Sequence, residues 1–233
     1  MSSALTKALC PLDNQKDISD SPLPLEACNY GIFGRKGCGK TSLLLNLIMK
    51  SESPWYKHFH RIFIISPTAK HDPKIMDLIK DIGQEQYYET LSNEVLEDII
   101  DKIEVIKKKK KKEKKQYCII YDDCIHLLKK CNMANRLATQ NRHHQITNVY
   151  LLQKFTGYMN PLIRSNLDLI SFFRTENEKE LNSLLEEVNG NDKVLRQMYE
   201  FATFAPYSFL HINMYSNPVK YYSRFDRIAF QKK

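Results

Sequence analysis

Closely spaced cysteine pairs are missing from this sequence. Its six cysteines include no CxxC pair. Six cysteines in 233 residues are also too few for the dense disulfide framework of a small secreted protein. We therefore expect reduced thiols and an intracellular compartment.

Long apolar stretches are missing as well. The longest runs are far shorter than the roughly 20 residues that a helix needs to cross a bilayer. The first residues, MSSALTKALCPLDNQKD, contain no apolar core of a secretory signal. We therefore expect a soluble protein without a membrane span. The sequence also contains no internal repeat.

The sequence does contain enough apolar material for a substantial core, with 42% hydrophobic residues, and its net charge is +8. A basic chain of this kind favours a polyanionic partner such as nucleic acid, although acidic substrates or a membrane surface would fit the charge too. Residues 1–26 hold three prolines and no sustained periodicity, which predicts a flexible N-terminal arm. We predict that residues 27–233 form a single domain.

Short apolar runs alternate with helical patterns along most of the chain. Runs of branched and aromatic residues predict strands, at 28–33, 61–66, 117–123, 148–154 and 167–173. Apolar residues spaced three and four apart predict helices, at 41–51, 72–82, 93–109, 124–144, 176–189 and 192–203. Residues 207–215 and 219–228 predict an antiparallel hairpin. The pattern predicts a three-layer α/β fold with a mainly parallel sheet and this hairpin at its C-terminal end.

The segment GRKGCGKT lies between the first predicted strand and the first predicted helix and matches G-x-x-x-x-G-K-[ST]. Glycines at these positions let backbone N–H groups point at a phosphate, and the helix adds the positive end of its dipole. We therefore predict a P-loop for ATP and Mg²⁺, in which Lys40 reaches the β- and γ-phosphates and Thr41 binds the metal. The predicted nucleotide-binding residues are Gly34, Arg35, Lys36, Gly37, Cys38, Gly39, Lys40, Thr41 and Ser42. The structural alternative is an ordinary glycine turn that leads into a helix.

Polar residues end two further predicted strands. YCIIYDD predicts that Asp122 binds the metal, usually through water, and that Asp123 polarises the attacking water. Taken alone, paired aspartates after a strand also suit a turn or a helix cap. Gln153 ends the strand NVYLLQK, where its amide could orient water or contact the γ-phosphate. The alternative is a polar residue that merely ends a strand.

With these motifs in this order, the sequence resembles the genome-packaging ATPases of large DNA viruses and virophages, which belong to the FtsK–HerA superfamily and include the poxvirus type. The resemblance spans about residues 28–175 and is carried by GRKGCGKT, CIIYDD, NRHHQITNVYLLQKF and LIRSNLDLISFF. It implies a RecA-like P-loop NTPase core with the strand order 5-1-4-3-2. It also implies ATP hydrolysis that drives double-stranded DNA, independently of base sequence, into a capsid.

The resemblance further implies a homo-oligomeric ring, capsid or portal proteins as partners, and a location in the host cytoplasm, a viral factory or the virion. In this family an arginine of one subunit completes a neighbour's site. Arg142 is the best match for that arginine and Arg164 the second. The sequence departs from the family pattern at Asp123, where many relatives carry Glu, and at Arg35 and Lys36, which replace small or neutral loop residues.

Three weaker patterns remain. The run KKKKKKEKK, residues 107–115, fits salt-dependent DNA contact, a solvated loop or a nuclear-import patch. Adjacent His143 and His144 cannot share one face of a regular element, and we predict no metal site there. Several later aromatic residues are predicted to be core and sheet residues: Phe172, Phe173, Phe201, Phe204, Tyr207, Phe209 and Tyr215.

Rival P-loop classes differ in their other motifs. A GTPase is disfavoured because no N-K-x-D follows the 148–154 strand and no D-x-x-G follows the acidic pair. A small-molecule kinase shares the P-loop, but we find no arginine-rich lid or acceptor pocket. A nucleotide-bound assembly scaffold with little hydrolysis is the third possibility, and the Asp at position 123 keeps it open.

Overall fold

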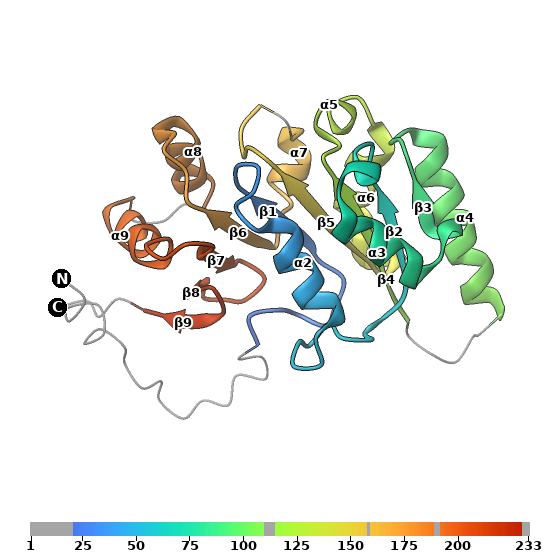
Figure 1. The fold of residues 1–233 in the computed structure, drawn as a ribbon, viewed down its shortest axis with the longest axis horizontal. Coiled ribbons are helices and arrows are strands. Elements are labelled where there is room, and N and C mark those ends of the chain that lie inside the picture. The colour runs from blue at the N-terminus through green and yellow to red at the C-terminus, as the bar shows by residue number, and fades with distance from the viewer. Residues whose placement is uncertain (1–20, 110–114, 158, 189–191, 230–233) are drawn as a thin grey trace.

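The computed structural model describes residues 21–109, 115–157, 159–188 and 192–229. A central sheet runs through this part of the chain, and helices cover both of its faces (Figure 1). None of the described helices is long and apolar enough to cross a membrane. The predicted class, a mainly parallel α/β sheet with antiparallel strands at the C-terminal end, is confirmed.

The described part of the sheet contains nine strands. In chain order they are β1 (Asn29–Phe33), β2 (Phe59–Ile65), β3 (Tyr87–Tyr88), β4 (Gln116–Asp122), β5 (Ile146–Leu152), β6 (Leu169–Phe173), β7 (Phe209–Asn213), β8 (Lys220–Ser223) and β9 (Asp226–Ile228). Every residue of β1, β5 and β6 is buried, as expected for central strands covered on both faces.

The strands lie in the order β3-β2-β4-β5-β1-β6-β7-β8-β9. Strands β2, β4, β5, β1 and β6 are parallel neighbours, and β7, β8 and β9 continue the sheet in antiparallel fashion. Numbered along the chain as the five predicted parallel strands, these neighbours read 5-1-4-3-2, so the order implied by the family resemblance is confirmed. The carboxyl ends of these strands meet at one edge of the sheet, where the predicted site residues follow β1, β4 and β5.

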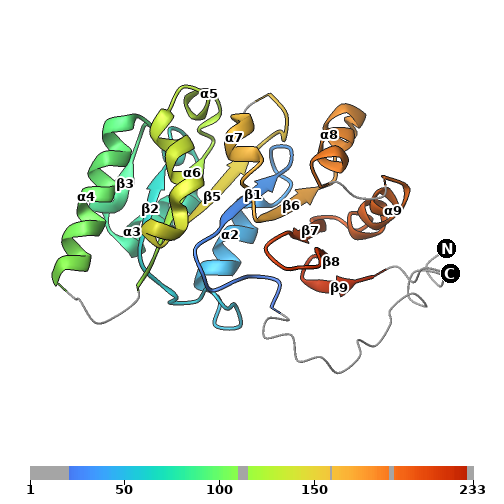
Figure 2. The ribbon, with the colours of Figure 1, turned by 180° about the vertical axis from the view of Figure 1, so that it is seen from behind.

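Helices form two layers around the sheet. They are α2 (Lys40–Met49), α3 (Pro73–Ile82), α4 (Asn93–Lys109), α5 (Ile125–Leu128), α6 (Asn132–His144), α7 (Pro161–Arg164), α8 (Glu178–Val188) and α9 (Asp192–Ala202), with short 3₁₀ turns at Ala69–His71 and Gln84–Gln86. Helices α2 and α3 lie in front of the sheet in Figure 1, whereas α4 and α6 cover the opposite face, which is seen in Figure 2. Apolar side chains form a buried core on each face.

The helical stretch predicted for residues 124–144 is divided into α5 and α6. Asn93, at the start of α4, caps the start of α6, because its side-chain oxygen accepts hydrogen bonds from Cys131 Sγ (3.4 Å) and from the Met133 backbone N–H (3.0 Å). A side chain from another element therefore fixes where α6 begins. Hydrophobic spacing within residues 124–144 could not reveal this contact.

The C-terminal strands also differ in detail from the prediction. Residues 219–228 form two paired strands, β8 and β9, with a tight turn at Arg224 and Phe225. The two-residue edge strand β3 was not predicted, because two residues are too few to show any periodicity.

Only the last part of the predicted N-terminal arm lies within the described residues. In this part Leu23 is buried, and the Pro24 carbonyl accepts a hydrogen bond of 2.8 Å from the Trp55 indole N–H. The Pro22 carbonyl lies 3.0 Å from Nε2 of the buried His211. Residues 21–26 are therefore packed against the domain, and residues 1–20 lie outside the described part of the chain.

Candidate nucleotide-binding cleft

The P-loop joins the end of β1 to the start of α2, as the sequence predicts. A Cβ atom added at Gly34 would lie 2.6 Å from Cys38 Sγ and 2.7 Å from Phe173 Cβ, so this buried position requires glycine. Gly37 and Gly39 have φ angles of 79° and 110°, which other residues adopt only with strain. The two glycines that the motif requires, Gly34 and Gly39, thus stand where the backbone leaves no room for a side chain or has a positive φ angle.

The start of α2 is suited to an anion. Gly39 occupies the N-cap, no side chain caps this end, and the first turn contains no acidic residue. The first backbone N–H groups of a helix lack partners within the helix, and the helix dipole is positive there. A phosphate is the ligand that such a helix end accepts best.

Lys40 lies across the loop. Its Nζ donates hydrogen bonds to the Gly34 carbonyl (2.6 Å) and the Arg35 carbonyl (3.2 Å). Burial lowers the pKa of Lys40, and the negative charges near it, including Asp122 and Asp123, oppose that effect. The ammonium group is therefore held at the loop carbonyls, within electrostatic reach of the acidic pair. The neighbouring side chains of Arg35 and Lys36 are exposed, and Lys36 also lines the cleft.

The acidic pair follows β4, whose neighbours are β2 and β5. Asp122 accepts a hydrogen bond of 2.7 Å from the Ser66 hydroxyl at the end of β2. Burial raises the pKa of Asp122, and the nearby Asp123 and Asp72 add to that effect. A cation beside Asp122 would therefore relieve an unfavourable buried charge.

Asp123 and Gln153 are brought together although they follow different strands. The Gln153 side-chain amide donates a hydrogen bond of 3.2 Å to Asp123 Oδ1. Asp123 has a left-handed backbone conformation with φ 52°, which aspartate tolerates better than most residues. This turn and the amide together set the direction of the carboxylate.

Asp72 is a further acidic residue in the cleft that the sequence analysis treated only as the start of a helix. Its Oδ1 accepts a hydrogen bond of 3.0 Å from the Lys74 backbone N–H and so caps α3. Its Oδ2 accepts a hydrogen bond of 3.3 Å from the Thr41 hydroxyl. Asp-Pro before a helical pattern is a signal for an N-cap. Nothing local to residue 72 indicates that its second oxygen reaches the P-loop.

Lys40, Thr41, Asp72, Asp122, Asp123 and Gln153 all line one cleft of about 1150 Å³. The strand order gives this cleft two ends, because β2, β4 and β5 lie on one side of β1 and β6–β9 on the other. The acidic end, beside β2, β4 and β5, contains Asp72, Asp122, Asp123 and Gln153. The P-loop follows β1, and beyond it the aromatic end contains Phe173, Tyr207, Phe209, Arg224 and Phe225. The structure thus brings the P-loop, the acidic pair and Gln153 into one site; their chemical roles remain predictions.

The prediction that the late aromatic residues belong to the core holds only for some of them. Phe172, Phe173 and Phe209 are buried. Phe201 on α9 is exposed, as are Phe204 and Tyr207 in the segment between α9 and β7. Tyr215 is only partly buried. Tyr207 at 70% exposure is therefore a cleft residue and not a core residue.

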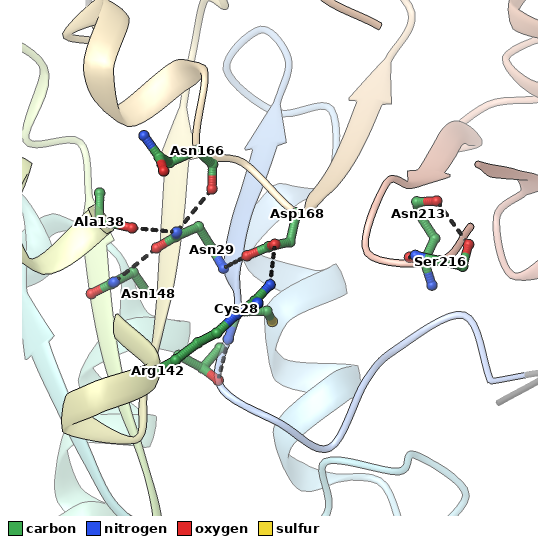
Figure 3. Close-up of polar contacts among 10 residues, drawn as sticks. Cys28, Asn29, Ala138, Arg142, Asn148, Asn166, Asp168, Asn213 and Ser216 are labelled. Carbon is green, nitrogen blue, oxygen red and sulfur yellow. Dashed lines mark hydrogen bonds and ion pairs between the residues drawn. The ribbon is translucent and has the colours of Figure 1, made fainter. Parts of the chain in front are cut away.

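Arg142 does not line the cleft of its own chain. It lies beside Asp168 near the start of β1 (Figure 3). Its Nη2 is 3.4 Å from Asp168 Oδ1, and Asp168 Oδ2 accepts a hydrogen bond of 2.8 Å from the Asn29 backbone N–H. Asn29 starts β1, whereas the P-loop follows the end of β1, so Arg142 lies at the opposite edge of the sheet. Its side chain is 67% exposed and lies over the Tyr215 ring.

Arg164, the second predicted arginine, ends the short helix α7. Its Nε lies 2.7 Å from Glu187 Oε2, and its guanidinium lies over the Phe155 ring. It does not line the cleft either. Neither arginine reaches the P-loop of its own chain, so a role for one of them in a neighbouring subunit's site remains a prediction.

The structure describes only the two ends of the lysine run. Lys107 is in α4 and Lys115 directly precedes β4, while residues 110–114 lie outside the described part. The predicted DNA contact of this run is therefore not located by the structure.

A bound Mg²⁺ fits the acidic end only together with a phosphate ligand. Among the described residues, no group of three or more His, Cys, Asp or Glu side chains could hold a metal ion by itself. Mg²⁺ in phosphate-transfer sites takes one or two protein oxygens and completes its shell with phosphate oxygens and water. The Thr41 hydroxyl and the Asp122 carboxylate are donors of that kind.

Comparisons with known proteins show a family and similar folds. The sequence model of the poxvirus A32 protein family matches residues 19–203. Comparison with curated proteins gives no significant match.

Solved structures show a similar fold. One is the genome-packaging NTPase B204 from Sulfolobus turreted icosahedral virus 2 in complex with AMP, with 19% identity, a TM-score of 0.61, and coverage of 86% of this chain and 98% of that one. Another is B204, the DNA-packaging ATPase from Sulfolobus turreted icosahedral virus, with 19% identity, a TM-score of 0.62, and coverage of 85% and 97%. The cytoplasmic domain of the type VII secretion ATPase EccC from Thermomonospora curvata has 15% identity and a TM-score of 0.55, and the match covers 89% of this chain and 24% of that one. These likenesses confirm the P-loop ATPase fold.

Proposed function

Because the chain belongs to the poxvirus A32 protein family, we propose that it hydrolyses ATP to move double-stranded DNA into a viral capsid. The observation that carries this proposal is the single cleft in which Lys40 of the P-loop lies near the carboxylates of Asp122 and Asp123. The B204 proteins of similar fold are described as a genome-packaging NTPase and a DNA-packaging ATPase, which supports the proposal.

The P-loop residues bind the triphosphate in this proposal. The backbone N–H groups at the start of α2 hold phosphate oxygens, and the Lys40 ammonium moves from the loop carbonyls to the β- and γ-phosphates. The loss of two carbonyl contacts is offset by stronger, charge-assisted hydrogen bonds to phosphate. Lys40 then neutralises part of the negative charge that develops during phosphoryl transfer.

The acidic end holds the metal and the water. Thr41 and Asp122, the latter usually through water, would hold Mg²⁺, which would supply positive charge to offset that of the phosphates. Asp72 positions the Thr41 hydroxyl through the hydrogen bond observed between them. The Ser66 hydroxyl fixes the Asp122 carboxylate by donating a hydrogen bond to its Oδ2.

Asp123 accepts a proton from the attacking water. The Gln153 amide holds one carboxylate oxygen of Asp123, so the other oxygen is available for the water. Proton transfer to a positioned carboxylate typically contributes 10²–10⁴-fold to a rate. If Gln153 contacts the γ-phosphate, its hydrogen bond to Asp123 links the presence of that phosphate to the position of the Asp123 carboxylate.

Coupling to DNA requires more than one subunit in this proposal. A homo-oligomeric ring would surround double-stranded DNA, and Arg142 or Arg164 would reach a neighbouring subunit's triphosphate. Capsid or portal proteins would be the further partners, in the host cytoplasm, a viral factory or the virion. The net charge of +8 suits a partner that is read by its phosphates and not by its base sequence.

Steady-state ATP hydrolysis with and without long double-stranded DNA at low salt tests the proposal. We expect DNA to stimulate turnover and Lys40→Ala to abolish it. Turnover stimulated by a nucleoside or another small acceptor would indicate a kinase instead, and nucleotide binding without turnover would indicate a scaffold. Mixing Lys40→Ala subunits with Arg142→Ala or Arg164→Ala subunits restores part of the turnover only for an arginine that acts in trans.

A further inference from the structure

A row of aromatic rings extends from the P-loop to the turn between β8 and β9. The rings of Phe173 and Phe209 have centroids 5.1 Å apart, and those of Phe209 and Phe225 are 5.5 Å apart. Phe173 lies against Gly34 of the P-loop, and all three rings line the cleft. The end of β6, the start of β7 and the turn between β8 and β9 thus provide an apolar wall beside the phosphate-binding loop.

Tyr207 stands at the exposed side of this wall. It is 70% exposed, yet its ring lies close to the loop, since a Cβ atom added at Gly39 would be 3.5 Å from Tyr207 Cδ1. An aromatic ring this exposed beside a phosphate-binding loop is accessible to a planar ligand.

Arg224 adds a cation to the same end. Its Nε donates a hydrogen bond of 3.3 Å to the Ser208 hydroxyl, and its backbone N–H donates one of 2.9 Å to the Phe209 carbonyl. These contacts link the turn that carries Arg224 to the segment that carries Tyr207. The side chain lines the cleft, where a guanidinium can stack on a planar group or pair with an anion.

The backbone at this end is held in an unusual conformation. Five non-glycine residues of the described chain have positive φ angles, and three of them line the cleft: Asp123 (52°), Tyr207 (58°) and Arg224 (55°). Such conformations cost free energy and tend to collect at functional sites. Two of the three belong to the aromatic end; the angle of Arg224 is that of a two-residue hairpin turn, whereas Tyr207 lies outside any such turn.

We propose that the aromatic end is the nucleobase subsite, in which Tyr207 stacks on the base and Arg224 supplies positive charge beside it. The proposal rests on the proposed function, because it assumes that a nucleoside triphosphate occupies the P-loop. The triphosphate at the loop places the rest of the nucleotide in the remaining cleft. An aromatic platform is what a base requires for sequence-tolerant stacking.

Binding measurements with and without a base test this inference. The two probes are a non-hydrolysable β,γ-methylene analogue of ATP and inorganic tripolyphosphate, both titrated calorimetrically with Mg²⁺ present. We expect Tyr207→Ala to weaken the ATP analogue about tenfold, which is at the low end for the loss of one base–aromatic stack. The same variant should leave tripolyphosphate affinity unchanged, and Tyr207→Phe should retain wild-type affinity for both probes.

Phe204→Ala is the matched control, because Phe204 is an equally surface-exposed aromatic residue, at 82%, that does not line the cleft. It should change neither affinity. A spectroscopic readout comes from 2-aminopurine riboside triphosphate, whose fluorescence is quenched by stacking. The quenching should be lost in Tyr207→Ala and kept in Tyr207→Phe.

The outcomes separate this inference from the proposed function. Equal losses for both probes in Tyr207→Ala would mean that the ring only supports the loop, and no loss for either would mean that the base lies elsewhere; either result overturns the subsite. A change of oligomeric state in Tyr207→Ala with unchanged nucleotide affinity would assign the ring to a subunit contact and also overturn it. If the wild-type protein binds neither probe, both proposals are overturned. If it binds both probes and Lys40→Ala abolishes that binding, the P-loop site is supported even where the Tyr207 variants overturn the base subsite.

Discussion

The two ends of the cleft are built by different halves of the sheet. The acidic end lies at the carboxyl ends of parallel strands, and hydrogen bonds from Ser66, Thr41 and Gln153 hold its carboxylates. The aromatic end comes from the end of β6 and from the antiparallel strands beyond it, where ring packing holds Phe209 and Phe225 and leaves Tyr207 exposed. Charged groups with fixed directions can hold a metal or a proton, whereas apolar rings supply binding area. The comparison teaches that hydrolysis and nucleotide affinity should be separable by substitution.

The largest expected effect is at the acidic end. Asp123→Asn should lower the rate of hydrolysis by about 10²–10⁴-fold, because an amide cannot accept the proton from water. Affinity for the non-hydrolysable ATP analogue should stay within about twofold, because the substitution leaves the P-loop unchanged. A tenfold change would correspond to about 1.4 kcal/mol. Turnover and calorimetric titration of the same preparation measure the two quantities.

Gln153→Ala is the control for the direction of the Asp123 carboxylate. It removes the 3.2 Å hydrogen bond and leaves the charge, so we expect a smaller loss of turnover than in Asp123→Asn. A Gln153→Ala variant that lost more turnover than Asp123→Asn would contradict the assignment of the proton to Asp123.

Acid should affect the two ends in opposite directions. His211 packs against Phe225 behind the aromatic end, with centroids 5.1 Å apart, and burial lowers its pKa from 6.5 to about 4. The folded state therefore favours the neutral ring, and the free energy of unfolding should fall as the pH drops from 6.5 to about 4. The total loss should approach about 3 kcal/mol, at 1.36 kcal/mol per pKa unit. Urea unfolding at a series of pH values measures it.

His211→Gln is the control, because a glutamine amide can still donate to the Pro22 carbonyl but does not titrate. The loss of stability between pH 6.5 and 4 should be smaller in this variant, whatever its stability at neutral pH. Burial raises the pKa of Asp122, so its ionised carboxylate destabilises the folded protein at pH values above that pKa. Protonation relieves this destabilisation as the pH falls through the pKa. Equal slopes for wild type and His211→Gln would remove His211 from the explanation.

The smallest expected effect concerns Asp72. Asp72→Asn keeps the cap of α3, because asparagine caps as well as aspartate, but removes a charge beside Thr41. We expect the gain in ATP-analogue affinity on adding Mg²⁺ to fall by about tenfold, the lower limit typical of residues that orient metal ligands. Affinity in EDTA should not change.

Asp77→Asn is the matched control for Asp72. Asp77 lies on the same helix and pairs with Lys80 at 2.8 Å on the exposed surface. It should leave the Mg²⁺ effect intact. If Asp77→Asn and Asp72→Asn reduced the Mg²⁺ effect equally, the loss would reflect general charge and not the hydrogen bond to Thr41.

Much of the acidic end could be predicted from sequence, because each of its main residues directly follows a strand pattern. GRKGCGKT, CIIYDD and the strand that ends at Gln153 are local signals, and the carboxyl ends of parallel strands meet at one edge. Asp72 was not predicted as a cleft residue, because its contact with Thr41 spans two helices. The prediction that Tyr207 is a core residue was wrong, because the sequence beside a predicted strand does not show whether an aromatic side chain there faces the core or the solvent.

The sequence by itself determined the strand and helix periods and the phosphate-binding loop, since these depend on side-chain spacing and on glycine within a few residues. Only the tertiary structure decided how the antiparallel strands pack against the P-loop, and with them the position of Tyr207 and Arg224. It also decided that Arg142 lies at the sheet edge opposite its own P-loop. The physical reason is that these placements depend on contacts between segments far apart in the chain, which no local pattern records.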